Sequence, residues 1–327
     1  MTLKEIAKIA GASQAAVSIV LNNKKGVGEA TRASVTQLLE QYGYQVNKPV
    51  EKNNILFIKY CTTGFIVEEN AGFVSVIMDS IEQECRNKNY NLNVLNSNNL
   101  NTTFESISFE DYEGIIILGT ELDTKGYTSL ETLKTPYVVI DNEIPNINCN
   151  AVTLNNQETV FHAISYLKSL GGKRIAYFRS NYPCHNFNER KKAFYEAVSD
   201  LGLDMTMEYD IAPTLLGAYE HMKQYLDQKR LDADCVFADN DTIALGAIKA
   251  LVEYGYKIPQ DVSIIGFDDI PYAAIASPTL TTMNINKKLI GELAMDLLQK
   301  TIQNKDYRNI KTYVSGTLVK RDSTVNA

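Results

Sequence analysis

From residue 55 onward, short apolar runs of strand length alternate with amphipathic segments of helical period. The apolar runs read ILFIKY, LNVLN, GIIIL, YVVID, RIAYF, CVFAD and VSIIGF. Helices are expected around residues 74–88, 159–170, 189–201 and 242–254. Continuous apolar runs indicate strands buried on both faces, as in parallel sheets joined by crossover helices. Because the strands are so many, we expect an α/β fold with two such sheets.

Acidic side chains follow the last apolar residue of three of these strands. They are Asp141, Asp239, Asp241, Asp268 and Asp269. Ligands of parallel α/β folds bind at the carboxyl ends of the strands. We therefore expect these positions to hold a polar ligand.

The first fifty residues differ from the rest in pattern and in charge. Three short helices are expected, from Leu3 to Ala10, from Ser13 to Leu21 and from about Glu29 to Tyr42. The polar segment QVNKPVEKNN, residues 45–54, then separates this head from the sheets. Residues 1–50 carry a charge of +3 and the remainder −10, within a net charge of −7. A positive head favours a polyanionic partner, although so modest an excess can also arise by chance.

The second short helix has an unusual exposed face. In GASQAAVSIVLNN, residues 11–23, Val17, Val20 and Leu21 follow a helical period, whereas the other face holds small side chains such as Ala15 and Ser18. A face without bulk or charge can lie against something large and flat. The alternative is an ordinary surface helix.

Length and composition exclude several classes of protein. A chain of 327 residues is long enough for two or three domains. No apolar run approaches the ~20 residues of a membrane span, and the N-terminus lacks the apolar core of a secretory signal. We therefore expect a cytoplasmic protein with no membrane partner. The five cysteines are scattered singly, which favours buried, reduced thiols.

The sequence lacks common enzyme motifs. It contains no G-x-S-x-G, no G-x-x-x-x-G-K phosphate loop and no G-x-G-x-x-G dinucleotide fingerprint. His162, His185 and His221 lie far apart and show no metal-ligand spacing. We therefore expect no catalytic residue, no metal and no cofactor.

Several of these segments together resemble the lactose/galactose repressor (LacI/GalR) family. TLKEIAKIAGASQAAVSIVLNNKKGVGEATRASVTQLLEQYGY is similar to the family's helix-turn-helix head, and DVSIIGFDDIPYAAIASPTLTTM with GTLVKRDST is similar to its effector-binding core. The resemblance spans nearly the whole chain, with gaps at the linker. It implies an all-α helix-turn-helix head followed by a two-lobed, parallel-sheet core like that of periplasmic binding proteins.

The resemblance assigns the bare helix face to DNA, where small side chains allow close approach in the major groove. Gln14 and Ala15 would read bases, with Ser18 nearby. The full set of DNA-binding residues that we expect is Thr2, Ser13, Gln14, Ala15, Ser18, Asn22, Lys24 and Thr31. Ile19 stands where the family usually has an arginine, a common guanine reader, so the sequence preference is expected to differ or to be weak.

The family's effector contacts imply five residues in the core. Arg190 would hold ligand hydroxyls or carboxylates through its planar fork of donors. Asn240 can both donate and accept, as sugar hydroxyls require. Asp141 and Asp268 end strands, and Phe73 matches an aromatic residue near the cleft, although core packing explains such a residue equally well.

The expected domains follow from the same resemblance. Residues 1–46 form the head, and residues 47–54 form a linker that lacks the family's hinge helix, since no leucine is present and Pro49 disfavours a helix. Residues 55–327 form the core and dimerisation region. Its two lobes are expected at about 55–153 plus 282–312 and about 154–281 plus 313–327.

We therefore expect a sequence-specific transcriptional regulator, a repressor by family resemblance, that forms a homodimer on a palindromic DNA operator. A small sugar-like effector in the core would change its affinity for that operator. The alternative is a solute-binding protein of a sugar transporter, which shares the core. Such a protein would need a secretory signal and would lack the head.

Overall fold

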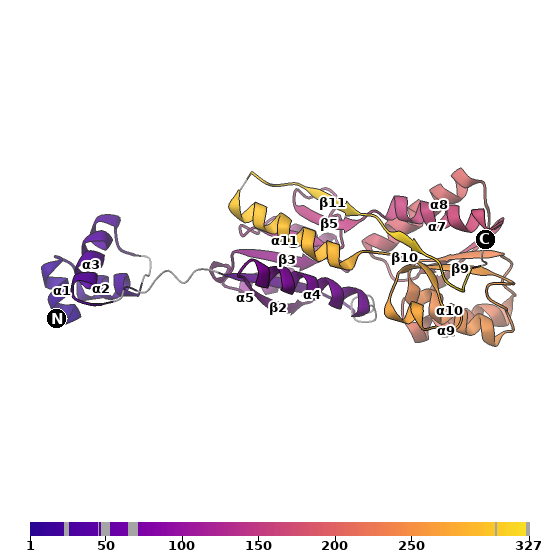
Figure 1. Cartoon of the computed structure of the whole chain (residues 1–327), viewed down its shortest axis with the longest axis horizontal. Coiled ribbons are helices and arrows are strands. Elements are labelled where there is room, and N and C mark those ends of the chain that lie inside the picture. The colour runs from indigo at the N-terminus through magenta and orange to yellow at the C-terminus, as the bar shows by residue number, and fades with distance from the viewer. Residues whose placement is uncertain (23–25, 45, 47–52, 65–70, 305, 325–327) are drawn as a thin grey trace. The chain divides into compact units, whose positions relative to one another are not determined.

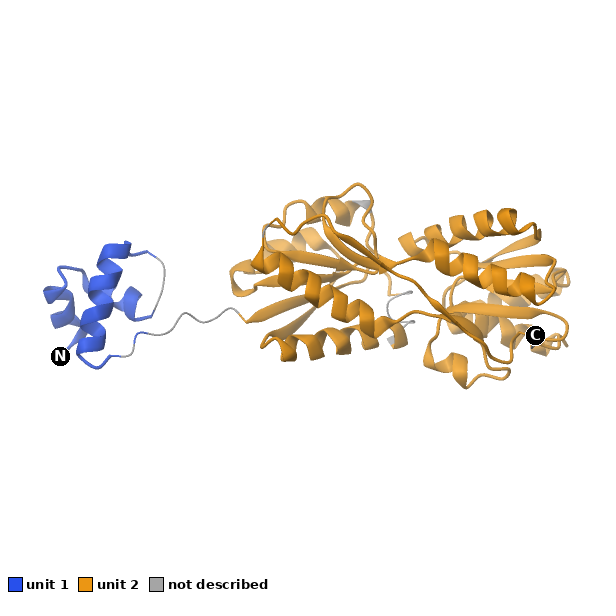
Figure 2. Ribbon diagram, turned by 45° about the horizontal axis from the view of Figure 1, so that its top comes forward, with its two compact units in different colours: residues 1–52 blue, residues 53–327 orange. Residues whose placement is uncertain are grey.

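The computed structural model describes residues 1–22, 26–44, 46, 53–64, 71–304 and 306–324. The chain divides into two compact units, Met1–Lys52 and Asn53–Ala327, which are coloured separately in Figure 2. Most of the expected linker, residues 47–52, and the expected DNA contact Lys24 lie outside the described residues. No helix of the described ranges is long and apolar enough to cross a membrane.

The first unit contains three short helices around a small apolar core. They are α1 (Leu3–Ile9), α2 (Gln14–Leu21) and α3 (Glu29–Gln41). Thr2 and Glu5 form a reciprocal capping box at the start of α1, and the Ser13 hydroxyl caps α2 by accepting from the Ala16 amide at 3.1 Å. The side chains that fill the core are fully buried: Ile6, Val17, Val20, Val35 and Leu39.

The second unit consists of two lobes, each built on a six-stranded sheet (Figure 1). The first sheet is parallel throughout, in the order β11-β5-β4-β3-β1-β2. Its strands are β1 (Asn54–Tyr60), β2 (Asn91–Ser97), β3 (Gly114–Leu118), β4 (Tyr137–Ile140), β5 (Asn150–Leu154) and β11 (Lys311–Val314). Its helices are α4 (Ala71–Asn87), α5 (Leu100–Ser106), the 3-10 turn η1 (Phe109–Asp111), α6 (Thr124–Leu130) and α11 (Lys287–Gln303).

The second sheet has the order β12-β10-β9-β8-β6-β7 and is parallel except for the pair β10–β12. Its strands are β6 (Arg174–Ser180), β7 (Asp204–Ile211), β8 (Cys235–Ala238), β9 (Ser263–Asp268), β10 (Thr281–Asn284) and β12 (Thr317–Val319). Its helices are α7 (Asn156–Ser169), α8 (His185–Leu201), α9 (Leu215–Gln228), α10 (Asp241–Glu253) and the 3-10 turn η2 (Pro271–Ala274).

Both faces of each sheet are covered, as the continuous apolar runs predict. In β1, Ile55 and Phe57 belong to the cluster that contains α4 and α11, whereas Leu56 and Ile58 pack on the opposite face with residues of α5 and α6. Successive strand residues point to opposite faces, so a strand between two helical layers needs apolar residues at every position. The predicted α/β class with two parallel sheets is confirmed.

The chain crosses between the lobes three times, after β5, after β10 and after β11. Strand β10 belongs to the second sheet and the whole of β11 to the first. The expected boundaries near residues 282 and 313 therefore cut through these two strands. The five cysteines, all within the described ranges, form no disulfide, and four of them are buried: Cys85, Cys149, Cys184 and Cys235.

Candidate functional site

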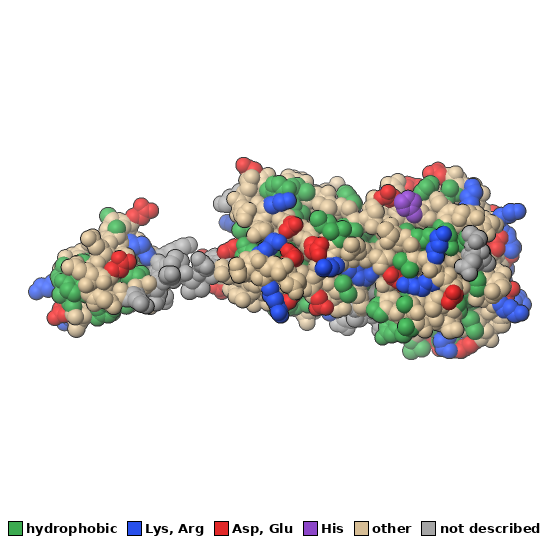
Figure 3. Space-filling model, in the orientation of Figure 1, with side chains coloured by type: hydrophobic (Ala, Val, Ile, Leu, Met, Phe, Trp, Pro, Cys, Tyr) green, Lys and Arg blue, Asp and Glu red, His purple; other side chains and the backbone are tan. Residues whose placement is uncertain are grey.

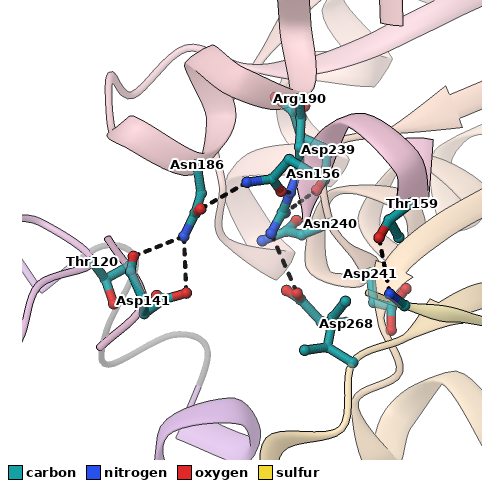
Figure 4. A network of polar contacts seen from close by, with 12 residues as sticks. Thr120, Asp141, Asn156, Thr159, Asn186, Arg190, Asp239, Asn240, Asp241 and Asp268 are labelled. Carbon is teal, nitrogen blue, oxygen red and sulfur yellow. Dashed lines mark hydrogen bonds and ion pairs between the residues drawn. The ribbon is translucent and has the colours of Figure 1, made fainter. Parts of the chain in front are cut away.

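The carboxyl ends of strands from both lobes meet around one polar cavity (Figure 4). It is lined by Phe73, Val74, Thr120, Asp141, Cys184, Asn186, Phe187, Arg190, Asn240 and Asp268. All five residues expected to contact an effector are in this set. The cavity has a volume of about 20 Å³, which is room for about one water molecule.

Arg190, on α8, lies at the centre of the polar network and is only 3% exposed. Its Nε donates to Asn156 Oδ1 at 3.0 Å, its Nη1 donates to the main-chain oxygen of Asp239, and its Nη2 lies 3.6 Å from Asp268 Oδ1. The guanidinium carbon lies 3.7 Å from the centroid of the Phe267 ring. Protein groups therefore hold all three nitrogens, and an aromatic ring covers one face of the guanidinium.

Asp141, at the end of β4, joins the two lobes. Its carboxylate accepts from Thr120 Oγ1 at 2.5 Å within the first lobe and from Asn186 Nδ2 at 2.9 Å from the second. The same Asn186 nitrogen donates to the main-chain oxygen of Asp141 at 3.0 Å. Burial raises the pKa of Asp141 to about 6, against the hydrogen bond from Thr120 and the charge of Arg190, which lower it.

The acidic strand ends have strained backbones. Asp141 has φ of 62°, Asp268 of 104° and Asp269 of 54°. Left-handed conformations are uncommon outside glycine, although asparagine and aspartate adopt them more readily than other residues, and they cluster at binding sites. The main-chain oxygen of Asp268 accepts from the buried Nζ of Lys287, which also donates to the main-chain oxygen of Ile285 at 3.2 Å.

Asn240 lies at the start of α10 and has a structural role as well. Its Oδ1 accepts from the Ile243 amide at 2.9 Å and thereby caps the helix. We expected its side chain to donate and accept with a ligand, but the cap already occupies the oxygen. The side-chain NH₂ group is the part that can donate to a ligand.

Three residues of the network, Asn156, Asn186 and Thr120, were not among those expected from the sequence. Asn186 precedes Arg190 by one helical turn, Asn156 starts α7, and the Asn156 Nδ2 donates to Asn186 Oδ1 at 2.9 Å. Thr120 follows β3. The one-turn spacing of Asn186 and Arg190 was a usable signal, because residues four apart share a helix face. Nothing local marks Asn156 or Thr120.

In the head, the described residues expected to contact DNA are exposed. They are Thr2, Ser13, Gln14, Ala15, Ser18, Asn22 and Thr31. The α2 members among them are Gln14, Ala15 and Ser18, while Ile19 is half-buried beside them. Asn22 Nδ2 donates to the Ser18 main-chain oxygen at 2.9 Å, which extends the polar surface beyond the helix end.

Comparisons with known proteins agree with this architecture. Residues 2–47 match the model of bacterial regulatory proteins of the lacI family, and residues 164–324 match the periplasmic binding protein-like domain. The HTH-type transcriptional repressor PurR of Pasteurella multocida is 29% identical over 332 residues, and that of Mannheimia succiniciproducens is 27% identical over 332 residues. Each alignment covers 98% of both chains.

Solved structures show the same fold. The lac repressor dimer bound to operator and the anti-inducer ONPF superimposes with a TM-score of 0.74 at 20% identity, covering 100% of this chain and 99% of that one. The complex of the transcriptional regulator CelR with cellobiose gives a TM-score of 0.73 at 22% identity, covering 99% of each chain.

A helix-turn-helix head joined to a two-lobed core with a polar interlobe cavity defines a DNA-binding regulator that responds to a small molecule. The chain belongs to the lacI family of bacterial regulatory proteins. It is thus a transcriptional regulator and not an enzyme. The alternative of a transporter's solute-binding protein is excluded by the head.

Proposed function

We propose that this regulator is a cytoplasmic repressor that binds a palindromic operator as a homodimer and responds to a sugar-like effector in the interlobe cavity. One observation carries the proposal of the effector site. Side chains from α4, β4, α8, β9 and the start of α10, far apart in sequence, converge on one buried polar cavity between the lobes. Buried carboxylates and amides are suited to hydroxyl groups, which donate and accept hydrogen bonds.

Effector binding requires the two lobes to separate. Small-molecule pockets usually have volumes of about 300–1,000 Å³, whereas this cavity has about 20 Å³. The hydrogen bonds from Asn186 to Asp141 cross between the lobes and are the contacts that an entering hydroxyl group would replace. Since binding free energies are reciprocally coupled, an effector that favours one lobe arrangement changes DNA affinity if the operator favours another.

An exposed apolar patch on the second lobe supports the homodimer. Ile275 is 77% exposed and Tyr272 57%, both at η2, and Val252 on α10 is 46% exposed beside them. They surround a hollow of about 520 Å³. Hydrophobic side chains gather along the lower edge of this lobe in Figure 3. Contiguous exposed apolar surface of this kind marks a protein interface.

The head is proposed to bind DNA through α2, with Gln14, Ala15 and Ser18 facing the base edges. The helix itself, QAAVSIVL, carries no charge, so attraction to phosphates must come from other parts of the head, such as Lys4, Lys8 and Arg32. We infer that base discrimination is modest, because Ile19 cannot supply the bidentate contact of an arginine to guanine.

A selection experiment tests the DNA-binding assignment. Full-length protein is incubated with fragmented genomic DNA of its source, bound fragments are sequenced, and fluorescence anisotropy measures affinity for the enriched sequence. We expect a palindromic site whose affinity falls with salt, because neutralised phosphates release counterions. Gln14→Ala should weaken binding to that site about tenfold or more, whereas Gln37→Ala, an exposed glutamine on α3, should not. Equal affinity of the unmodified protein, Gln14→Ala and Gln37→Ala for the enriched site would contradict the assignment of α2 as the DNA-reading helix.

A further inference from the structure

We propose that the interlobe cavity selects an effector that carries hydrogen-bond donors and no negative charge, and therefore rejects the phosphorylated or carboxylated form of the same compound. The inference rests on the proposed function, since it concerns the effector of that same cavity. It separates a free sugar, polyol or amine-bearing ring from a sugar phosphate or a sugar acid.

The cavity offers little positive charge to an anion. Among the described residues that line it, Arg190 is the only cation. Its guanidinium is paired with Asp268 and hydrogen-bonded to Asn156 and to the Asp239 main chain. The Phe267 ring packs on it at 3.7 Å, and the Phe187 ring lies 5.6 Å away. An anionic group would have to displace a buried carboxylate from this arginine in order to reach it.

Carboxylates approach the cavity from both lobes. Asp141 belongs to the first lobe and Asp268 to the second, and they are 2% and 3% exposed. The charge of Asp268 contributes to raising the pKa of Asp141, so the two groups interact across the cavity. A third carboxylate, that of Asp239, accepts from the Ser180 amide at 2.6 Å and from the Tyr177 hydroxyl. A bound anion would meet this surplus of negative charge.

The nearest second cation does not reverse this balance. The Lys287 Nζ lies 5.9 Å from the centroid of the Phe73 ring, but it donates to the main-chain oxygens of Asp268, Asp269 and Ile285. The Asp269 carboxylate is paired with Arg321 at 2.7 Å, so this pair adds no net charge to the balance. Asp141, Asp239 and Asp268 thus face Arg190 and Lys287, both of which are engaged by protein groups. The charge of Arg179 also acts on Asp239, but Arg179 is itself paired with Glu208 and Asp210.

The same groups favour hydrogen-bond donors. Ionised carboxylates only accept hydrogen bonds, so Asp141 and Asp268 can receive hydroxyl, amine or ring N–H groups from two sides of one ligand. Phe73 from the first lobe and Phe187 from the second line the cavity as apolar surfaces. Aromatic side chains pack against the C–H face of a sugar ring or the plane of a heterocycle.

Isothermal titration calorimetry on the full-length chain tests the proposal with compounds that share one ring. One series is glucose, glucosamine, glucose 6-phosphate and glucuronate, and shorter series are ribose with ribose 5-phosphate and adenosine with AMP. The anionic member of any binding series should bind at least about 100-fold more weakly than its uncharged or amine-bearing parent, because like charges repel strongly in a partly desolvated site. Asp268→Asn removes the charged partner of Arg190. It should reduce the ratio of the anion's dissociation constant to that of its parent about tenfold or more.

The matched control is Asp200→Asn, an exposed aspartate on α8, which should leave the ratio unchanged. The proposal is overturned if an anion binds within tenfold of its parent, or if no uncharged or amine-bearing compound binds. The proposed regulatory function fails separately. A neutral compound that binds but leaves operator affinity unchanged would refute the proposed regulation and support the charge selectivity. An anion that binds tightly and alters operator affinity would support the proposed regulation and refute the charge selectivity.

Discussion

Asn186 donates from one amide nitrogen to both the carboxylate and the main-chain oxygen of Asp141, at 2.9 and 3.0 Å, and each residue belongs to a different lobe. Asn186 in turn accepts from Asn156, which accepts from Arg190. A continuous hydrogen-bonded path therefore runs from the first lobe to the guanidinium in the second. The arrangement of the lobes and the position of the arginine are therefore linked through two side-chain amides, those of Asn186 and Asn156.

Asn186→Ala should loosen the contact between the lobes. The substitution removes a donor from the buried Asp141 carboxylate, which costs about 1–3 kcal/mol of unfolding free energy. We expect a larger radius of gyration in solution scattering of the core and a lower urea midpoint. Gln157→Ala, at an exposed position nearby, should change neither. An unaltered scattering profile for Asn186→Ala would show that this amide does not hold the lobes together.

Arg190→Lys should abolish most of the effector response while operator binding persists, because lysine keeps the charge but cannot form the fork of contacts to Asn156, Asp239 and Asp268. Arg190→Ala should do the same and also destabilise the core by about 3–5 kcal/mol, since Asp268 is left buried and unpaired. Calorimetric titration with any compound that binds the unmodified protein measures the loss. The control is Lys192→Ala, an exposed cation two residues along α8. Unchanged effector affinity in Arg190→Lys would remove the guanidinium from the binding site.

The stability of the core should fall as pH rises from about 4 to 8. Burial raises the pKa of Asp241 to about 8, although its carboxylate accepts from Thr282 and from the Ile270 amide. The folded state therefore retains a proton that the unfolded chain releases above about pH 4, and each pH unit in this window costs up to about 1.4 kcal/mol. Asp141 and Asp239, each with a pKa raised to about 6 by burial, add to the loss at the lower end of the window.

Asp241→Asn provides the test of that pH dependence. The asparagine amide stays neutral at every pH, can accept from the Ile270 amide and can donate to Thr282. The free energy of unfolding of the variant, relative to that of the unmodified protein, should therefore be higher at pH 8 than at pH 5. Urea unfolding at both pH values measures the difference. Asp200→Asn should give parallel curves. If the gap between Asp241→Asn and the unmodified protein is the same at both values, the buried carboxyl does not carry a proton.

Ile275→Asp should dissociate the proposed homodimer, because it places a charge at the most exposed apolar position of the second-lobe patch. Analytical ultracentrifugation across a protein concentration series should show a monomer, and operator affinity should drop as the two heads lose their coupling. Met207→Asp makes the same change at a 40% exposed position on the edge strand β7 and should remain dimeric. A dimeric Ile275→Asp would move the interface to another surface.

The fold class was predictable because most central strands are buried on both faces and so read as continuous apolar runs. Strand β7 was not predicted, since it lies at a sheet edge and its sequence DMTMEYDI mixes exposed and buried positions. Strands β10, β11 and β12 are only three or four residues long and carry polar side chains, and their pairing depends on the distant segments at which the chain crosses between lobes. No local pattern encodes such a crossing.

Some residues of the candidate site could likewise be located from the sequence, and others could not. Asp141 and Asp268 could be placed by their position after a strand, and Arg190 by its family motif. Asn186 could have been found by its spacing, because it lies one helical turn before Arg190 on α8. Asn156 could not, because its role comes from a contact between two helices, α7 and α8, whose mutual packing the sequence does not state. Asp241 was expected at the ligand, but it is buried beneath β9, where a Cβ on Gly266 would lie 2.2 Å from its Oδ1.

The three crossings between the lobes also determine the order in which this chain can fold during synthesis. The first lobe contains β1 to β5, but it needs α11 and β11, which are made only after nearly all of the second lobe. Until then β5 is an open edge, and the apolar face that α11 later covers is bare. Unpaired edges and exposed apolar faces are the surfaces on which nascent chains aggregate. The N-terminal head has a core made only of residues from its own three helices and can fold as soon as it emerges, whereas the first lobe is completed only when α11 and β11 have been made.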